Sequence, residues 1–475
     1  MTAVAVHHSP CAGYWYPSDP KKLRRLLDDS FRQSGERIGT DLLPGAAGLV
    51  VPHAGIAYSG TVAAAVYRSI ERDRPERVII LGFAHRGSPP GAWIPDIERY
   101  ATPLGETAVD REATGQLLAS GAYQSMREDA LCDHSVEIQL PFLRKAVPEA
   151  RVVPVYVSAL DEAARSRAAR ALTEIMGPGA VAVASSDFTH YGDAFRYKPF
   201  PQNDQTPARL RALDDGFIEA LGSLDSSLLL RALQSEAATV CGREPLTLLQ
   251  ETIRRLPEGE EHFQRTLDYQ TSGEVTGDYS HCVSYAALGL YPWRSFHLDP
   301  AEQRLLLDSA RETLRAYQET GRRTPKPPAR ITARLNRKAG VFVTLHQNGQ
   351  LRGCVGRISG SGPLSHSVPE MTLAAALEDS RFDPLGREER GIDLEVSVLS
   401  PMKRLVNVER FRAGRDGGCL KAGGLSGLLL PQVAEGRAWT SREFLQALAR
   451  KTGVAESVYR DPEARLYVFR AQVIR

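Results

Sequence analysis

The chain contains few cysteines, and their spacing shows no pairing pattern. Among its 475 residues only six are Cys, and no two of them form a CxxC pair; they lie at positions 11, 132, 241, 282, 354 and 419. This spacing excludes a zinc ribbon and a small disulfide-bonded secreted domain. Scattered cysteines of this kind are typical of a reducing compartment, so we expect a cytoplasmic protein.

Long apolar segments are also missing. No apolar run approaches the roughly 18 residues that span a bilayer, and residues 1–9 lack the basic start and the apolar stretch of a signal peptide. We therefore expect no membrane partner. The hydrophobic share of 42% and the charged share of 24% are typical of a globular protein. At about 150 residues per domain, the length predicts two or three domains.

The net charge of +2 hides two halves of opposite sign. Residues 1–294 hold 30 Lys and Arg against 37 Asp and Glu, a balance of −7, whereas residues 295–475 hold 29 against 20, a balance of +9. Two domains that attract each other, a basic half with an anionic partner, or merely unequal solvated surfaces would all give this pattern. No nucleic-acid-binding motif or dense basic stripe accompanies it, so we expect no nucleic-acid partner.

The first half of the chain alternates short apolar runs with helical patterns. Four runs are β-branched and apolar on both faces, as the strands of a covered sheet are: Gly48–Val51, Arg77–Leu81, Val152–Val157 and Ala180–Ala184. Helices are predicted at 18–33, 59–72, 135–147, 159–176, 207–235 and 244–256. This alternation predicts an α/β domain with a mainly parallel sheet flanked by helices, which a late strand at 282–290 extends.

A change of pattern near residue 299 marks a domain boundary. Asp299-Pro300-Ala-Glu302 has the Asp cap, the first-turn Pro and the third-position Glu of a helix start. A Pro-rich basic connector at 322–328 and strands at 340–345 and 394–399 follow. We therefore predict two domains, residues 1–293 and 299–475, the second being a smaller α+β domain.

Three predicted strands of the first domain are each followed by a histidine. His53 comes after the first strand, His85 after the second and His190 after the run at 180–184, while His134 precedes a helix. A lone loop histidine is more often a hydrogen-bonded surface residue than a ligand. The carboxyl ends of parallel strands meet at one crevice, however, so three histidines at such ends indicate a shared site.

Two cysteines are candidates for chemistry. Cys241 lies just ahead of a predicted helix, where the helix dipole and Arg243 would favour a thiolate, but a small buried apolar role fits equally well. Cys354 lies in Arg352-Gly-Cys-Val-Gly356, which is interpreted as a Gly-bounded turn presenting a guanidinium and a thiol. A nucleophilic Cys354 is one interpretation; a structural turn closing the hairpin around Asn348-Gly349 is favoured.

Six motifs of the first domain resemble those of one known family. In order they are Ala12-Gly-Tyr-Trp-Tyr-Pro17, Pro52-His-Ala-Gly55, Gly82-Phe-Ala-His85, Asp133-His-Ser-Val-Glu137, Ser185-Ser-Asp-Phe-Thr-His190 and Thr239-Val-Cys-Gly242. Their order over residues 7–291 is similar to that of the Memo family, which resembles the class III extradiol ring-cleaving dioxygenases in fold.

The resemblance implies a mononuclear metal site with His53, His85 and Cys241 as ligands. It implies catalytic roles for His190 as acid and base, for Asp187 in orienting it, and for His134 at the edge of the crevice. The chain departs from the family at Phe83-Ala84, where Pro and a small polar residue usually precede the histidine. This departure affects the surroundings of the ligand rather than the ligand itself.

The second domain resembles the AMMECR family over about 299–473. The similar motifs are Leu351-Arg-Gly-Cys-Val-Gly356, Ala374-Ala-Ala-Leu-Glu-Asp-Ser-Arg-Phe382, Gly414-Arg-Asp-Gly417 and Gly427-Leu-Leu-Leu-Pro-Gln-Val433. Memo and AMMECR domains occur with a radical-SAM protein in the AmmeMemoRadiSam system, so the resemblance implies a fusion of two of its parts and a radical-SAM partner. No cluster-binding Cys motif is present, so iron–sulfur chemistry would belong to a separate chain.

Three functions are compatible with these residues. The first is a metal-dependent oxidoreductase of the extradiol-dioxygenase type that acts on a small-molecule substrate. Its N,N,S ligand set favours a single iron or copper ion, accommodates zinc and excludes magnesium and calcium. The second is a non-catalytic metal-containing module that binds a peptide or an anionic ligand. The third is a zinc hydrolase, although the chain has no H-E-x-x-H helix.

Overall fold

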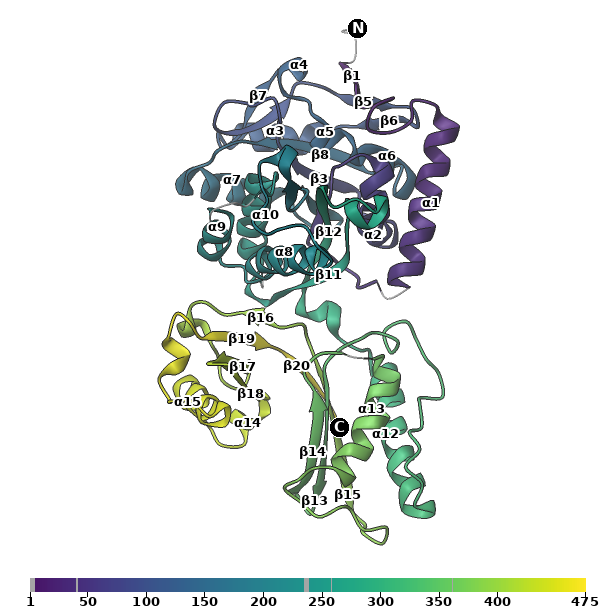
Figure 1. Cartoon of the computed structure of the whole chain (residues 1–475), viewed down its shortest axis with the longest axis vertical. Helices are drawn as coiled ribbons and strands as arrows, with labels where there is room; N and C mark the ends of the chain where they lie inside the picture. The colour runs from purple at the N-terminus through teal and green to yellow at the C-terminus, as the bar shows by residue number, and fades with distance from the viewer. Residues whose placement is uncertain (1–4, 40–41, 235–238, 258, 361) are drawn as a thin grey trace. The chain divides into compact units, whose positions relative to one another are not determined.

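The computed structural model describes residues 5–39, 42–234, 239–257, 259–360 and 362–475 (Figure 1). Backbone contacts divide the chain into two compact units, Met1–Ser295 and Phe296–Arg475, here called the N-terminal and the C-terminal unit. Each unit has a hydrophobic core of its own. Within the described ranges, no helix is both long and apolar enough to cross a bilayer.

A parallel sheet forms the centre of the N-terminal unit. Its four central strands lie in the order β2 (Gly48–Val51), β9 (Ala180–Ser185), β3 (Arg77–Gly82) and β8 (Arg151–Val157). Nearly all of their side chains are buried, because helices cover both faces of the sheet. The predicted α/β fold is confirmed, and the ends of these strands differ from the predicted ends by at most one residue.

Further strands extend the sheet on both sides. β12 (His281–Pro292) pairs antiparallel with β2, and both β10 (His190–Gly192) and β11 (His262–Thr271) pair with β12. On the opposite side, β4 (Ala92–Pro95) pairs antiparallel with β8 and parallel with β7 (Gln124–Met126). The predicted late strand is confirmed as β12. β11 is not predicted, because a bulge interrupts its alternation of apolar and polar residues.

Helices cover both faces of this sheet. α2 (Ile56–Asp73) connects β2 to β3 and α7 (Glu162–Ile175) connects β8 to β9, so the two crossovers run in opposite directions along the sheet. Since such crossovers are right-handed, the two helices lie on opposite faces. α1 (Pro20–Ile38) packs against α2, and α10 (Arg243–Arg255) packs against α7 and β9.

Two predicted helices are divided in the structure. The stretch predicted at 207–235 forms α8 (Thr206–Gly222) and α9 (Ser226–Gln234), because Leu224 between them has a left-handed backbone conformation with φ of 56°. Residue 235 lies outside the described residues. The stretch predicted at 135–147 forms α5 (His134–Glu137) and α6 (Gln139–Ala146), since Pro141 has no N–H to donate to the turn before it.

Smaller elements complete the N-terminal unit. A three-stranded sheet consists of β1 (Val6–His8), β5 (Arg99–Thr102) and β6 (Gly105–Ala108). The other short helices are α3 (Arg111–Ala119), α4 (Glu128–Leu131) and α11 (Ser272–Thr276). β1 brings His7 beside α4 and α5, where its ring contacts two carboxylates.

The C-terminal unit contains two four-stranded sheets. The first has the order β14 (Gln350–Arg357), β13 (Val341–Gln347), β15 (Ile392–Leu399) and β20 (Ala471–Ile474). The second has the order β16 (Lys403–Arg404), β19 (Arg465–Phe469), β17 (Gly417–Ala422) and β18 (Leu425–Leu429). All of their pairings are antiparallel, so this unit has the predicted α+β character.

Helices pack against both of these sheets (Figure 1). α12 (Pro300–Thr320) and α13 (Leu364–Leu377) pack against the first sheet, and α15 (Ser441–Thr452) packs against the second, with the short α14 (Gln432–Glu435) before it. The predicted start of α12 is confirmed, because Asp299 caps the helix and Glu302 completes a capping box.

The motif around Cys354 does not form the predicted turn. It lies within β14, where Cys354 stands opposite Thr344 of β13. The turn of this hairpin is Asn348-Gly349, whose φ angles of 53° and 75° suit a type I′ turn. Glycine at 353 permits close packing instead of a turn, since a Cβ there would lie 2.1 Å from the carbonyl oxygen of Ala375.

Candidate metal centre

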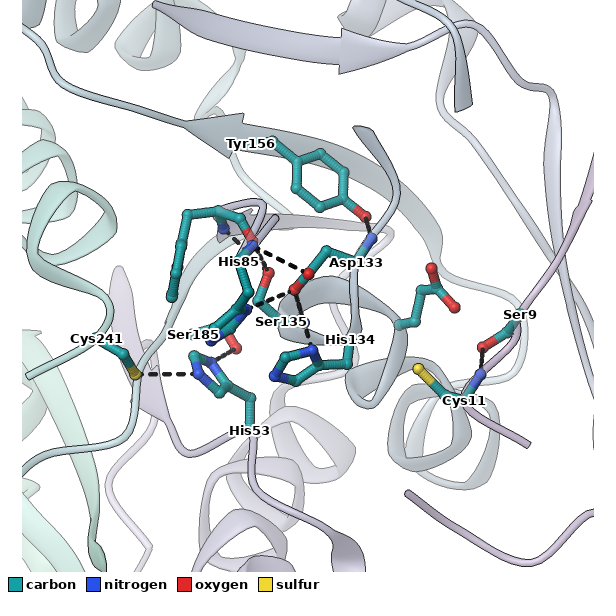
Figure 2. A network of polar contacts seen from close by, with 12 residues as sticks. Ser9, Cys11, His53, His85, Asp133, His134, Ser135, Tyr156, Ser185 and Cys241 are labelled. Carbon is teal, nitrogen blue, oxygen red and sulfur yellow. Dashed lines mark hydrogen bonds and ion pairs between the residues drawn. The ribbon is translucent and has the colours of Figure 1, made fainter. Parts of the chain in front are cut away.

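Three neighbouring strands bring chemically active side chains to one edge of the parallel sheet. β2, β9 and β3 are adjacent and parallel, and the segments after their carboxyl ends carry His53, Asp187 and His85. His134 reaches the same place from the start of α5 (Figure 2). The ring centroids of His53 and His85 are 5.2 Å apart, and those of His85 and His134 are 4.0 Å apart.

His53 is buried, and its hydrogen bonds determine which ring nitrogen faces the crevice. Nδ1 lies 3.0 Å from Ser185 Oγ, and Nε2 lies 3.1 Å from Cys241 Sγ. Ser185 Oγ also accepts a hydrogen bond from Gln139 Nε2 at 3.1 Å. The backbone N–H of His53 donates to Asp187 Oδ1 at 2.8 Å, so the segment after β9 holds the segment after β2.

Cys241 lies two residues before α10, and its sulfur accepts a hydrogen bond from the Asp187 backbone N–H at 3.2 Å. Burial raises the pKa of the Cys241 thiol, and the charge of Asp187 raises it further. The expectation that the helix dipole and Arg243 would favour a thiolate is wrong, because burial dominates and the Arg243 side chain donates to the Leu233 carbonyl. A thiol of this kind gives up its proton when a metal ion replaces it.

One carboxylate orients two of the histidines. Asp133 Oδ1 lies 2.8 Å from His85 Nδ1 and 3.3 Å from His134 Nδ1, while Asp133 Oδ2 accepts from the His85 backbone N–H at 3.1 Å. Trp15 stacks on the His134 ring, with centroids 3.9 Å apart. Asp133 is not among the predicted site residues. Its place at the cap of α5, next to a candidate histidine, is the sequence signal that identifies it.

Burial favours the neutral imidazole at His53 and His134. It lowers the pKa of His53 well below the usual value, and the charges of His134 and His85 lower it further. Burial also lowers the pKa of His134 to about 4, against the attraction of Asp133. For Asp133 itself burial opposes ionisation, but the hydrogen bond from His85 and the charge of His134 bring its pKa down to about 2. Neutral imidazole is the form that binds metal ions.

Two groups of potential ligand atoms overlap at His53. The ligand atoms of His53, His85 and His134 all lie within 4.8 Å of one another, and so do those of His53, Asp187 and Cys241. His85 and Cys241 therefore each lie close to His53, but they belong to different groups, and no group contains both of them. The sequence predicts His134 as a residue at the edge of the crevice, whereas its position makes it a further candidate ligand.

His190 lies at the start of β10 and belongs to neither group. Its Nδ1 is 3.0 Å from the carbonyl oxygen of Phe188. Because a carbonyl only accepts, Nδ1 donates to it, and Nε2 is the nitrogen that remains available for proton exchange. The Phe188 carbonyl thus orients this ring, whereas the predicted orienting residue, Asp187, accepts from the backbone of His53. Burial raises the pKa of Asp187, against the charge of His190.

A cavity of about 450 Å³ lies beside Cys241. Its walls come from the ends of β3 and β8 and from the start of α10, and they include Phe83, Val157 and Glu244. The Phe83 ring lies 4.1 Å from the His85 ring and 5.7 Å from the His53 ring, between centroids. A volume of this size accommodates a small organic molecule.

The C-terminal unit has a second cavity, of about 630 Å³, at Cys354. Thr344 Oγ1 donates to Cys354 Sγ at 3.3 Å, and the Cys354 backbone N–H donates to Asp379 Oδ2 at 2.8 Å. The hydrogen bond from Arg381 lowers the pKa of Asp379 to about 2. Cys354 is therefore a fixed thiol at the wall of a cavity.

Both units match known protein families. Residues 7–289 match the family described as Memo-like protein, and residues 307–474 match AMMECR1. A protein memo-1 homolog from Caenorhabditis elegans is 31% identical over 284 residues, which cover 58% of this chain and 80% of that protein. A MEMO1 family protein from Thermoplasma acidophilum is 34% identical over 279 residues, which cover 58% of this chain and 96% of that protein. Among solved structures, an uncharacterized protein from Pyrococcus horikoshii is 33% identical, with 35% of this chain and 88% of that chain covered and a TM-score of 0.34.

Proposed function

The chain belongs to the Memo family, and from that premise we propose that its N-terminal unit is a metal-dependent oxidoreductase with a mononuclear centre at His53, His85 and Cys241. The main support is the distance of 3.1 Å between His53 Nε2 and Cys241 Sγ. An imidazole nitrogen and a thiol sulfur this close are donors that one transition-metal ion can bridge.

The surroundings of the histidines fit such an ion. Ser185 contacts Nδ1 of His53, and Asp133 contacts Nδ1 of His85, so each ring presents Nε2 to the centre. Metal-binding histidines usually have their second ring nitrogen hydrogen-bonded in this way. Two imidazoles and a thiolate favour iron or copper and also accommodate zinc. When bound, the ion supplies Lewis acidity and, for iron or copper, electron transfer.

The chain's own residues supply binding and proton transfer. A small-molecule substrate would occupy the cavity beside Cys241, where the Phe83 ring forms an apolar wall next to His85. His190 would accept a proton at Nε2, because its Nδ1 donates to a carbonyl and fixes the tautomer. Asp187 would keep the His53 segment in place through their backbone hydrogen bond.

A zinc hydrolase is a second candidate, and one observation favours it. The ligand atoms of His53, His85 and His134 lie within 4.8 Å of one another. Three histidines with an open fourth position are the ligand set of one class of catalytic zinc site. In that case Cys241 would lie outside the coordination sphere.

Metal analysis with matched variants separates the two candidates. The full chain is purified anaerobically, and its metal content and visible spectrum are recorded. A thiolate-to-metal charge-transfer band that Cys241→Ser removes would support the oxidoreductase. Colourless zinc that Cys241→Ser retains and His134→Gln loses would support the hydrolase. Cys354→Ser, in the other unit, is the control and should change neither readout. A chain that binds no transition metal after reconstitution would contradict both.

We further propose that a radical-SAM protein acts on the same substrate or on its product. The support is the AMMECR1 domain at 307–474, fused to the Memo domain in one chain. The six cysteines contain no cluster-binding motif, so the iron–sulfur cluster would belong to the partner. Co-purification with such a protein, together with a coupled assay under reducing conditions, tests this proposal, and failure of both would refute it.

A further inference from the structure

A third group of side chains that could hold a metal ion lies outside the proposed centre. The ligand atoms of His7, Cys132 and Glu137 all lie within 4.8 Å of one another. They come from β1, from the residue after α4 and from the end of α5. The metal centre proposed above makes no use of these three residues.

Glu137 is the residue of this group that most needs a partner. It is 0% exposed, and its Oε1 lies 3.1 Å from His7 Nε2. Its other oxygen, Oε2, is buried and accepts no well-aligned hydrogen bond among the described residues, although burial raises the pKa of the Cys11 thiol and the carboxylate lies close enough to that thiol to raise it further. An unsatisfied buried acceptor is costly, and each such atom in a native protein calls for a physical reason. A cation between the three side chains would supply one.

His7 is already arranged as a metal-binding histidine. Its Nδ1 lies 2.9 Å from Glu128 Oε2, while its Nε2 faces Glu137. A ligand histidine usually donates its second ring N–H to a carboxylate or a carbonyl, which fixes the ring and increases its basicity. Glu128 is 42% exposed at the side chain and thus stands at the rim of the group, with His7 and Glu137 inside.

Cys132 supplies the sulfur donor. Burial raises the pKa of its thiol to about 12, and its sulfur lies 3.6 Å from the hydroxyl of Tyr100. For His7, burial opposes a charge, but the hydrogen bonds and charges of Glu137 and Glu128 raise its pKa. The Cys132 thiol therefore keeps its proton when no ion is bound, and a metal ion would displace it.

We propose that His7, Cys132 and Glu137 bind a zinc-type divalent ion, with Nε2, Sγ and a carboxylate oxygen as ligands. Zinc takes nitrogen, sulfur and oxygen donors of this kind, and the thiolate and the carboxylate together balance its two charges. Binding releases the thiol proton and any proton on His7 Nε2, while Nδ1 stays bonded to Glu128. No redox step is involved.

The position of this site indicates a structural role. Cys132 and Glu137 flank Asp133 and His134 in sequence, and these two face the first centre. In Figure 2, Ser9 and Cys11, which follow β1, lie on the far side of His134 from Cys241. An ion here would link β1 to α5 and hold the segment that orients His85. The site itself does not depend on the proposed function of the first centre.

Cobalt binding to the full-length Cys241→Ser chain tests the proposal. Since this substitution removes the thiol of the first centre, a thiolate-to-cobalt charge-transfer band must come from another cysteine. We expect one such band per chain, lost when Cys132→Ser is added and retained when Cys354→Ser is added instead. Absence of the band, or its survival in Cys132→Ser, would overturn the proposal.

Two further variants in the same background keep the test decisive if Cys132→Ser does not fold. Loss of a residue that only orients a ligand typically lowers metal affinity by roughly 10–100-fold, and Glu128→Gln should stay within this range. Glu137→Gln and His7→Gln each remove a ligand, so we expect each to lower zinc affinity by more. Zinc should also raise the thermal midpoint of the Cys241→Ser chain by more than that of Glu137→Gln in this background, because only the former keeps all three ligands of the proposed site. Equal zinc affinity in all three variants would show that the group is only a set of ion pairs.

Discussion

Ser185 and Asp133 determine which nitrogen of each ligand histidine faces the proposed centre. Ser185 stands opposite Val51 in the register of β2 and β9, so it lies beside the segment of His53. Asp133 comes from the cap of α5 and reaches His85 from outside the sheet. A histidine held at Nδ1 has a fixed ring orientation, which lowers the entropic cost of binding an ion at Nε2.

Asp133→Asn should therefore weaken metal binding without removing a ligand. The amide lacks the charge that holds His85 and His134, so we expect a loss of affinity of roughly 10–100-fold. Isothermal titration with Zn²⁺ measures it. Asp129→Asn is the matched control, because Asp129 is exposed and pairs only with Arg127 in the described part of the chain. Equal affinities for the two variants would show that Asp133 does not orient the ligands.

At the scale of residues, the sequence indicates which side chains carry chemistry but not which partners hold them. His53 and His85 follow apolar strands, and that position alone predicts a common crevice. Their partners depend on strand register and on the start of α5, which an apolar pattern does not encode. The same holds for His7, whose neighbours lie 121 and 130 residues further along the chain.

Helices and strands are predicted well from the sequence where one or both of their faces are buried. They are predicted poorly where a single backbone angle determines where an element ends. The four central strands follow from their β-branched apolar runs. The division between α8 and α9 depends on Leu224, a buried leucine with positive φ, and nothing in its side chain signals this conformation. The glycines of the motif at 352–356 suggest a turn, but in the structure they permit close packing within a strand.

Two glycine substitutions test this distinction between backbone angle and packing. Gly349→Ala should lower the free energy of unfolding by roughly 1–2 kcal/mol, since φ of 75° in the hairpin turn is unfavourable for alanine. Gly216→Ala in α8 should raise it by about 0.5–1 kcal/mol, because no atom lies within 4 Å of the added Cβ and alanine favours a helix. Denaturant titration of the full chain measures both. The same sign for both would refute the argument.

At the scale of the whole molecule, the charge asymmetry coincides with the division into units. The balance of −7 belongs to residues 1–294 and that of +9 to residues 295–475, and the compact units divide after Ser295. Residue 296 belongs with the C-terminal unit, because Arg337 donates to the Phe296 carbonyl at 2.8 Å. The predicted second domain, which starts at 299, would lack this contact.

We therefore expect fragments 1–295 and 296–475 to fold separately and to associate weakly. Each has its own core, which supports independent folding, and their opposite charges should attract at low ionic strength. Circular dichroism and thermal unfolding test the folding of each fragment, and titration of one into the other at rising salt tests the association. Attraction between exposed charges should fade as the Debye length falls from about 30 Å at 0.01 M salt to about 8 Å at 0.15 M. Aggregation of both fragments beside a well-folded full chain would refute independent folding, and binding that salt does not change would refute the electrostatic part.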